Sequence, residues 1–359
     1  MTDEDLMRMA LDLARRGEGA VNPNPLVGAL VVRDGEVVGR GYHQQFGGPH
    51  AEVFALLEAG DAARGATIYV TLEPCVHHGK TPPCVDRILA AGVKRAVIAC
   101  QDPNPLVDGK GIAALRATGM DVRVGVLGDE AIRLNEAFFT FIRTGRPFVL
   151  LKLAMSLDGK IATASGDSKW ISGEASRTRV HELRRRLAAI LVGVGTVVAD
   201  DPLLTVRRVE GRNPLRIVLD GAGRMPSSAR LLREPGRTVV VTAAMSDAAE
   251  AALRRAGAEV WRLPDSGARV DLPALLDRLG REGIDSLLVE GGAETAASFV
   301  EGDLIDKVSF FIAPILLGGR HAVPAVGGAG VPTVSLGKRL RDVAVERIGE
   351  DLLVTGMLG

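Results

Sequence analysis

The chain has 359 residues, of which 44 are Lys or Arg and 44 are Asp or Glu, so its formal net charge is zero. A protein that binds nucleic acid through the phosphate backbone needs a positive surface, so this balance argues against a nucleic-acid partner and favours a small substrate. The length allows two or three domains, each with a sizeable core.

The cysteine content and the apolar pattern indicate in which cellular compartment the protein is found. Three cysteines in a chain of this length suggest no disulfide framework, which fits a reducing cytosol. The N-terminus is acidic, and no long uninterrupted apolar stretch follows it. We therefore expect a cytoplasmic protein without a membrane segment. Whether it forms a homo-oligomer is left open by the sequence.

The first elements in chain order are a helix and a hairpin. Apolar residues recur at helical spacing over 5–15, which predicts a helix. The prolines of segment 21–28 exclude a regular element there. Strands are predicted over 29–32 and 36–39, joined by Asp34-Gly35, a dipeptide typical of tight hairpin turns.

The next stretch contains the residues of a zinc site. Glu52 lies two residues after His50, and Pro74-Cys75 is followed by Cys84. One imidazole and two thiolates are ligands that zinc prefers, and three protein ligands leave a fourth position for water. Glu52 is suited to move protons between such a water molecule and a leaving amine. This His-x-Glu and Pro-Cys combination is the signature of the zinc deaminases.

The spacing of the two cysteines departs from the generic signature, which places them three positions apart. A buried strand over 66–71 and a helix over 85–90 nevertheless bring both thiols to one place, and a helix N-terminus favours the thiolate of Cys84. Two alternatives stay open. The zinc could be structural, with His77 or His78 as a fourth ligand, or the cysteines could be ordinary small buried residues.

Strands and helices continue to alternate through the rest of the first half. We predict a strand over 93–100, a polar loop over 101–105, a helix over 112–118, a strand over 122–126 and a helix over 130–143. The loop follows the end of a strand, where open α/β sheets bind ligands. Gly145-Arg146-Pro147 then breaks the pattern, so the predicted domains are 1–145 and 146–359.

In the second half, apolar strands alternate with amphipathic helices. The predicted strands cover 148–154, 190–194, 215–219, 239–242, 287–289 and 308–312. This order indicates a mostly parallel α/β sheet. Glycines follow two of the strands, at Gly193-Val194-Gly195 and at Gly291-Gly292, where free backbone amides suit a phosphate group. Tight turns without a ligand are the more common role of such glycines.

Four stretches together resemble one known family. They are His50-Ala51-Glu52, the loop from Pro74 to Cys84, the segment 101–105 and the segment 152–160. In this order they closely resemble the bifunctional pyrimidine deaminase/reductase family of riboflavin biosynthesis, over essentially the whole chain. The resemblance implies an α/β protein in which a zinc-dependent, cytidine-deaminase-like three-layer domain precedes an NADPH-dependent domain similar to dihydrofolate reductase.

The resemblance also implies two reactions. The first domain would deaminate 2,5-diamino-6-(5-phosphoribosylamino)pyrimidin-4(3H)-one at its 2-amino group. The second would reduce the ribosyl chain to a ribityl chain with NADPH, giving 5-amino-6-(5-phosphoribitylamino)uracil. Lys152, Asp200 and Glu290 stay open as the group that assists proton transfer in the reduction.

The family's functional residues carry over to positions in both halves. The zinc ligands are His50, Cys75 and Cys84, and the proton shuttle is Glu52. The deaminase substrate contacts are Asn24, His43, His77, Lys80, Asp102 and Asn104. The reductase substrate contacts are Ser168, Arg184, Leu204, Arg207 and Glu290. The cofactor contacts are Ala154, Trp170, Thr196, Asp200, Gly292, Ala293, Glu294, Thr295, Ala296, Ala297 and Ser298. The cations Lys80, Arg184 and Arg207 suit a substrate phosphate.

Two other functions compete with this one. A nucleic-acid base deaminase with an appended domain predicts a basic surface with aromatic side chains for stacked bases, whereas aromatic residues are 4% of this chain. The other is a zinc-stabilised binding module without activity. A Glu52→Ala variant separates this module from the enzyme, because a structural site keeps its zinc and has no activity to lose.

Overall fold

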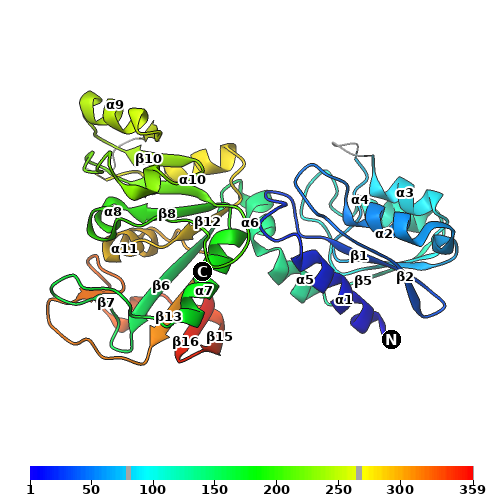
Figure 1. Ribbon diagram of the computed structural model, residues 1–359. Coiled ribbons are helices and arrows are strands. Elements are labelled where there is room, and N and C mark those ends of the chain that lie inside the picture. Colours follow the sequence, from blue (N-terminus) through cyan, green and yellow to red (C-terminus); the bar gives the residue numbers. More distant parts are fainter. Residues whose placement is uncertain (78–81, 264–268, 359) are drawn as a thin grey trace. The chain divides into compact units, whose positions relative to one another are not determined.

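A computed structural model describes residues 1–77, 82–263 and 269–358. The chain divides into two units, Met1–Gly145 and Arg146–Gly359, and each is described by itself (Figure 1). In these described ranges, no helix combines the length and the apolar character that crossing a membrane requires.

The first unit is a sheet with helices on both faces. Its described strands are β1 (Gly28–Arg33), β2 (Glu36–Tyr42), β3 (Thr67–Val70), β4 (Arg95–Ile98) and β5 (Asp121–Val124). They are arranged in the order β2-β1-β3-β4-β5, in which β1 pairs antiparallel with β2 and β3 and the other pairs are parallel. Its helices are α1 (Asp3–Arg15), α2 (Ala51–Ala59), η1 (Gly60–Ala63), α3 (Cys84–Ala90), α4 (Lys110–Ala117), α5 (Gly128–Leu134) and α6 (Glu136–Thr144).

Glycines in the strands let helices approach both faces of this sheet. A Cβ added at Gly28 of β1 would lie 1.9 Å from the carbonyl oxygen of Ala10 in α1. A Cβ added at Gly41 of β2 would lie 2.1 Å from the carbonyl oxygen of Ala51 in α2. Gly41 pairs with the residue after Gly28, so the two positions face opposite sides of the sheet. Thus α1 covers one face and α2 the other, and Figure 1 shows α3 and α4 beside α2.

The predicted helix, hairpin and strands of the first unit are confirmed. The predicted single helix over 130–143 was wrong, because α5 and α6 are separated at Asn135. The buried side chain of Asn135 accepts the N–H of Leu26 at 2.7 Å and donates to the carbonyl of Leu26 at 3.0 Å. These bonds to a loop distant in sequence favour the break in the helix.

The second unit is built on a larger sheet. Nine strands form it in the described part: β6 (Phe148–Ser156), β8 (Ala189–Gly193), β9 (Leu215–Leu219), β10 (Thr238–Thr242), β11 (Glu259–Arg262), β12 (Ser286–Val289), β13 (Lys307–Ala313), β15 (Leu340–Ile348) and β16 (Asp351–Leu358). A separate small pair joins β7 (Lys160–Ala162) to β14 (Val323–Pro324). The helices are α7 (Glu174–Arg186), α8 (Val194–Asp200), η2 (Arg230–Leu232), α9 (Asp247–Arg255), α10 (Leu272–Arg281), α11 (Ala293–Glu301) and η3 (Val334–Leu336).

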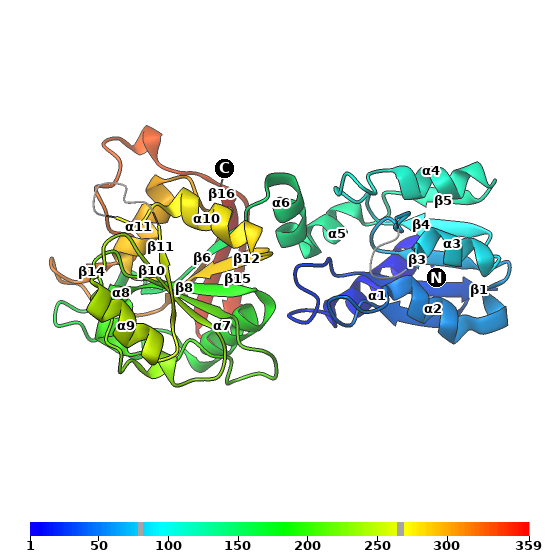
Figure 2. The same ribbon diagram turned by 90° about the horizontal axis from the view of Figure 1, so that it is seen from above.

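The predicted mostly parallel sheet is confirmed. Its order is β11-β10-β9-β8-β12-β6-β13-β16-β15, and neighbours are parallel from β11 to β13 and antiparallel beyond. Figure 2 shows α10 and α11 on one face and α7 on the other. Because α8 and α11 begin where β8 and β12 end, the two glycine segments meet, and Thr196 Oγ1 accepts the Gly292 N–H at 3.1 Å.

Candidate active sites

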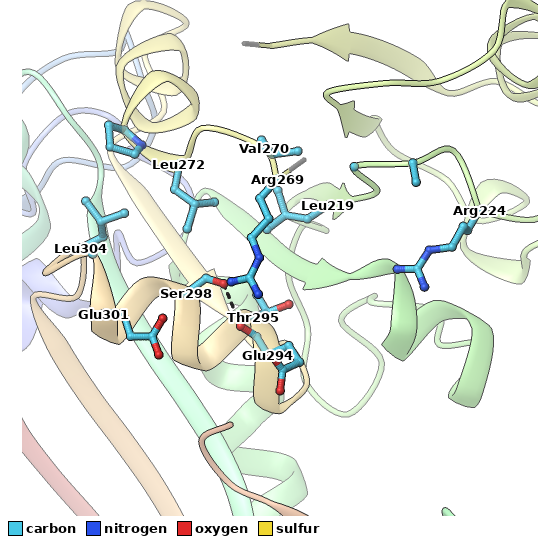
Figure 3. A pocket seen from close by; sticks show the side chains of 14 residues that line it. Leu219, Arg224, Arg269, Val270, Leu272, Glu294, Thr295, Ser298, Glu301 and Leu304 are labelled. Atoms are coloured by element: carbon cyan, nitrogen blue, oxygen red, sulfur yellow. Dashed lines mark hydrogen bonds between the residues drawn. The ribbon is translucent and has the colours of Figure 1, made fainter. Parts of the chain in front are cut away.

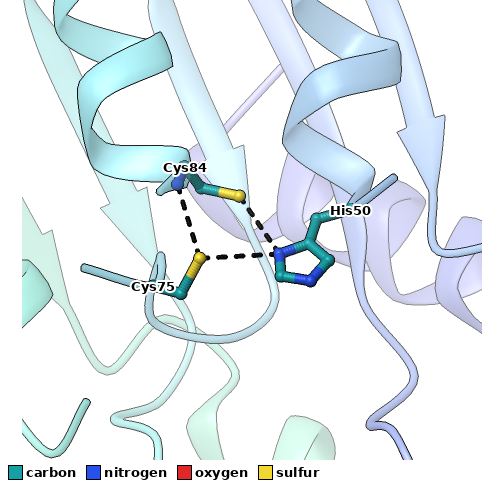
Figure 4. A group of neighbouring side chains, drawn as sticks. All are labelled: His50, Cys75 and Cys84. Carbon is teal, nitrogen blue, oxygen red and sulfur yellow. Dashed lines mark hydrogen bonds between the residues drawn. The ribbon is translucent and has the colours of Figure 1, made fainter. Parts of the chain in front are cut away.

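The three predicted zinc ligands meet in the first unit. His50 is the N-cap of α2, Cys75 follows β3, and Cys84 is the first residue of α3. The Nδ1 atom of His50 lies 3.2 Å from the Sγ atom of Cys84 and 3.6 Å from that of Cys75 (Figure 4). Zinc bonds of about 2.0–2.3 Å in a tetrahedron place nitrogen and sulfur ligands about 3.5 Å apart. The donor atoms therefore fit a zinc ion.

The number of ligands decides between a catalytic and a structural site. In the part of the chain that the structure describes, the ligand group consists of His50, Cys75 and Cys84. His77 is described and does not belong to this group, and His78 lies outside the described residues. A group of three protein ligands is the catalytic arrangement.

Cys75 is surrounded by hydrogen-bond donors. Its Sγ atom accepts the backbone N–H of Cys84 at 3.4 Å, at the start of α3. Hydrogen bonds from the Cys84 thiol and from His50 lower the pKa of Cys75 against the opposing effect of burial. The same pairing raises the pKa of Cys84. Zinc needs both groups as thiolates, so its binding releases protons.

Glu52 lies in the first turn of α2 and is only 3% exposed. Its Oε2 atom is buried and has no hydrogen-bond partner among the described residues. Burial raises the pKa of Glu52, and the charge of His50 opposes this shift. A buried oxygen without a partner is costly, so it is expected where a reacting molecule completes the site.

His43 and Asn24, both predicted substrate contacts, lie next to the zinc ligands. The His43 ring lies edge-on to the ring of His50, with centroids 5.5 Å apart. The Pro49 carbonyl can only accept, so His43 Nδ1 donates to it at 3.0 Å and Nε2 accepts from the Asn24 amide at 3.0 Å. Burial lowers the pKa of His43, which favours this neutral form.

The remaining predicted deaminase contacts lie in two loops. Asp102 is buried and accepts the N–H of Asn104 at 2.8 Å, and burial raises its pKa to about 6. His77 has a buried Nδ1 atom without a partner among the described residues. Lys80 lies outside the described residues, so its role as a phosphate contact stays a prediction.

Sequence reasoning missed Glu73, which holds the Asp102 loop in place. One carboxylate oxygen accepts the N–H groups of Asp102 at 3.2 Å and Gly109 at 2.9 Å, and the other accepts the N–H of Ile112 at 3.0 Å. Its partners are backbone atoms far along the chain, for which the sequence contains no signal.

A pocket of about 710 Å³ at the carboxyl ends of β6, β8 and β12 collects the predicted reductase residues. It is lined by all five predicted substrate contacts, Ser168, Arg184, Leu204, Arg207 and Glu290. It is also lined by the predicted cofactor contacts Ala154, Trp170, Thr196, Asp200 and Gly292. Of the other cofactor contacts, Glu294, Thr295 and Ser298 line a second pocket, and Ala293, Ala296 and Ala297 are buried.

Glu290 forms a buried ion cluster in this pocket. Its carboxylate accepts two hydrogen bonds from Arg184, at 2.7 and 2.9 Å, and one from Lys152 at 3.3 Å. Burial opposes ionisation, but the charges of Arg184 and Lys152 outweigh it and lower the pKa of Glu290 to about 2. The donors of Arg184 are thus engaged by a buried carboxylate, which differs from the expected role as a phosphate clamp.

Arg207 is held in place by His181, a residue that the sequence did not single out. The Arg207 N–H donates to His181 Nδ1 at 3.0 Å, and the Arg207 guanidinium donates to Thr205 Oγ1 at 2.7 Å. Burial and the charges of Arg184 and Arg207 lower the pKa of His181 to about 4, so the ring is neutral. Further cations line the pocket, at Lys169, Arg177, Arg208 and Arg230. This surplus of positive charge suits a phosphorylated substrate.

Comparisons with known proteins agree with this arrangement. A family model described as the cytidine and deoxycytidylate deaminase zinc-binding region matches residues 1–100, and one described as the RibD C-terminal domain matches residues 147–354. The riboflavin biosynthesis protein RibD of Actinobacillus pleuropneumoniae is 46% identical over 356 residues, which cover 99% of this chain and 95% of that relative. This chain belongs to the RibD family.

Solved RibD structures share the whole fold. That of Acinetobacter baumannii RibD has a TM-score of 0.89 at 38% identity, with 99% of each chain covered. A Thermotoga maritima structure titled diaminohydroxyphosphoribosylaminopyrimidine deaminase/5-amino-6-(5-phosphoribosylamino)uracil reductase has a TM-score of 0.88 at 40% identity, with 99% of each chain covered. The predicted family and α/β fold class are therefore confirmed, and as a RibD protein the chain combines a zinc-dependent deaminase with a reductase.

Proposed function

We propose that this chain converts 2,5-diamino-6-(5-phosphoribosylamino)pyrimidin-4(3H)-one into 5-amino-6-(5-phosphoribitylamino)uracil in riboflavin biosynthesis. Deamination at the 2-amino group comes first, and reduction of the ribosyl chain with NADPH follows. The observation that carries this proposal is the three-ligand group of His50, Cys75 and Cys84 beside the unpaired carboxylate oxygen of Glu52. The cation-lined pocket of the second unit supports the reduction.

In the deamination, Glu52 is the group that moves protons. When bound by the three ligands, zinc supplies a positive charge that brings the pKa of a water molecule close to neutrality. Glu52 takes a proton from the attacking water and delivers it to the amine nitrogen as the C–N bond breaks. Ammonia leaves and a carbonyl group remains on the ring. Asn24, His43, Asp102 and Asn104 orient the pyrimidine, and Lys80 binds its phosphate.

In the reduction, the chain orients its substrates and provides a proton. NADPH supplies the hydride, which adds to C1′ of the ring-opened imine, while one proton adds to the imine nitrogen. Glu290 is ionised near neutral pH and has no proton to give, because its pKa is about 2. We assign the proton to the ammonium group of Lys152, which Glu290 orients. Arg207 contacts the substrate phosphate.

A coupled assay tests both steps together. The diaminopyrimidine nucleotide is supplied with NADPH, and ammonia release and cofactor absorbance are followed in the same sample. Equal amounts of ammonia and oxidised NADPH support the proposal, and a substrate that is already deaminated should consume NADPH without ammonia. Ammonia release without any NADPH oxidation would contradict the proposed reduction and show that the chain acts only as a deaminase. The cytoplasmic location stays a prediction.

A further inference from the structure

Trp170 is a large apolar side chain that is open to solvent at the reductase pocket. It lines that pocket and is 71% exposed, whereas Trp261, the other tryptophan of the chain, is 4% exposed. An open indole face gains free energy when it is covered, and inside a pocket the covering group is a ligand. The Trp170 side chain therefore suits stacking on a flat ring.

The position of Trp170 shows which ligands could cover it. It belongs to the reductase pocket, whereas the described lining of the second pocket, along α11, does not include it (Figure 3). A ligand that covers the indole thus occupies the pocket that also contains Lys152 and Glu290. Both reactants of the proposed reduction carry a flat ring, which is the nicotinamide in NADPH and the pyrimidine in the nucleotide.

The segment that carries Trp170 is anchored on both sides. Before it, the Ser168 hydroxyl donates to the carboxylate of Asp200 in α8 at 3.3 Å. After it, the Ser172 carbonyl accepts a hydrogen bond from the guanidinium of Arg177 in α7 at 2.6 Å. The backbone around the indole is therefore tied to two helices that border the pocket.

Arg177 also contacts the indole itself. Its Cζ atom lies 4.7 Å from the centroid of the Trp170 ring, which is within cation–π distance, so the guanidinium covers one face of the ring. The start of α7 is fixed in turn, because the buried carboxylate of Asp351 accepts the Gly173 N–H at 2.8 Å and the Ser176 hydroxyl. The indole is thus supported on one face from a fixed helix.

The placement of this guanidinium is costly. The Nε atom of Arg177 is buried and has no hydrogen-bond partner among the described residues. A buried donor without a partner lowers stability, so a functional role is expected where one is retained. The same side chain stays bonded to the Ser172 carbonyl and packed on Trp170. Support of the indole is a role that fits this cost.

We propose that Arg177 is a positioning residue of the reduction, which holds the Trp170 indole so that its other face stacks on the flat ring of a bound reactant. This inference deepens the proposed reductase function and rests on it. Trp170 is a predicted cofactor contact, so NADPH is the expected reactant. Removal of the cation should weaken binding of that reactant about two- to fivefold, which is the value of an exposed cation–π contact.

Tryptophan fluorescence tests the stacking without catalysis. Acrylamide quenches the exposed Trp170 far more than the buried Trp261, so quenching of the full chain reports on Trp170. NADP⁺ and the deaminated pyrimidine nucleotide are added separately, and we expect NADP⁺ to protect the indole from acrylamide. In Arg177→Met, the ligand concentration that gives half of this protection should rise about two- to fivefold. Absence of protection by either ligand, or an unchanged half-point in the variant, would overturn the proposal.

Kinetics provides an independent check. In Arg177→Met, the KM of the reactant that protects Trp170 should rise by the same factor, while the KM of the other reactant and the rate of ammonia release stay unchanged. Arg177→Lys keeps a cation and should have a KM closer to the wild-type value. A KM that rises for the reactant without protection, or a lysine variant as weak as the methionine variant, would contradict the role of Arg177.

Arg179→Met is the matched control. Arg179 lies on the same helix, outside the described lining of the pocket, and pairs with Glu346 at 3.2 Å. Its substitution should change neither the protection of Trp170 nor either KM. A wild type that oxidises no NADPH contradicts the proposed reductase, whereas the protection of Trp170 and its weakening in Arg177→Met still decide the role of Arg177.

Discussion

Glu52 combines burial with an unpaired oxygen, and this sets its expected role. Glu52→Gln should lower the rate of ammonia release about 10²- to 10⁴-fold, because the amide cannot carry the proton. The zinc content should stay at the wild-type level, since Glu52 is not in the ligand group of the described residues. Ammonia release and metal content are measured on the same preparation.

Glu58 provides the matched control for this substitution. It lies on the same helix, is exposed, and accepts the N–H of Arg40 at 2.9 Å. Glu58→Gln should leave both ammonia release and zinc content unchanged. Loss of zinc in the Glu52 variant would mean that the carboxylate is a ligand, and the assignment as proton shuttle would then fail.

Single residues could be predicted where chemistry restricts the residue type. Zinc accepts few ligand types, so His50, Cys75 and Cys84 stood out despite the unusual spacing of the cysteines. Glu73 and His181 act by bonding to backbone N–H groups, which every loop provides. Such partners are defined only by the folded backbone, so no residue pattern could identify them.

At the scale of an element, Glu73 links the end of β3 to the loop before α4. Glu73→Gln places an amide N–H₂ against backbone donors, which should destabilise the first unit by about 2 kcal/mol. We also expect a higher KM for the diaminopyrimidine, because the loop carries Asp102 and Asn104, with zinc content unchanged. Urea unfolding and steady-state kinetics measure these effects. Glu36→Gln, at an exposed position in β2, should change neither the unfolding free energy nor the KM. A Glu73 variant with an unaltered KM would refute the positioning role of Glu73.

Asp3 ties α1 to the sheet and makes stability depend on pH. Its carboxylate accepts hydrogen bonds of 2.7 Å from Arg95, Tyr69 and Arg123. These hydrogen bonds, of which that from Arg95 has the largest effect, lower the pKa of Asp3 from 3.8 to about 2. The unfolded chain binds this proton more readily, so the stabilisation is complete above about pH 4 and is lost as pH falls toward about 2.

Asp3→Asn should therefore cost about 1 kcal/mol of unfolding free energy at pH 7, a value reduced by the solvent exposure of Arg123. The difference from the wild type should shrink at pH 3. Urea unfolding at both pH values measures it. Asp12→Asn, at an exposed position on α1, should show no such trend. A difference that stays constant between pH 7 and pH 3 would exclude the ionised carboxylate as its source.

Among the elements, the buried parallel strands were predictable and the final hairpin was not. Apolar runs identify β8 and β12, because both of their faces are covered, and β9 is apolar apart from the buried Arg216. Most of β15 is exposed and carries charges at Arg341, Asp342, Glu346 and Arg347, so its apolar pattern is weak. The break at Asn135 depends on a loop more than a hundred residues away, which local periodicity does not include.

On the scale of the whole molecule, each unit holds the described residues of one candidate site. All three zinc ligands and Glu52 belong to the first unit, whose core is formed from its own sheet and helices. The reductase pocket is lined by residues of the second unit, which has a separate core. The two activities should therefore be lost independently when a substitution affects one site.

Cys75→Ser in the full chain tests this independence. A serine hydroxyl is a poor zinc ligand, so the variant should lose zinc and release no ammonia. Its reduction of the already deaminated substrate should stay close to the wild-type rate. Cys100→Ser is the matched control, because Cys100 is also buried but lies outside the ligand group, and its thiol donates to the Thr71 carbonyl at 3.5 Å as a hydroxyl would. Loss of both activities in the Cys75 variant, with the Cys100 variant intact, would show that zinc supports the folding of the reductase unit as well.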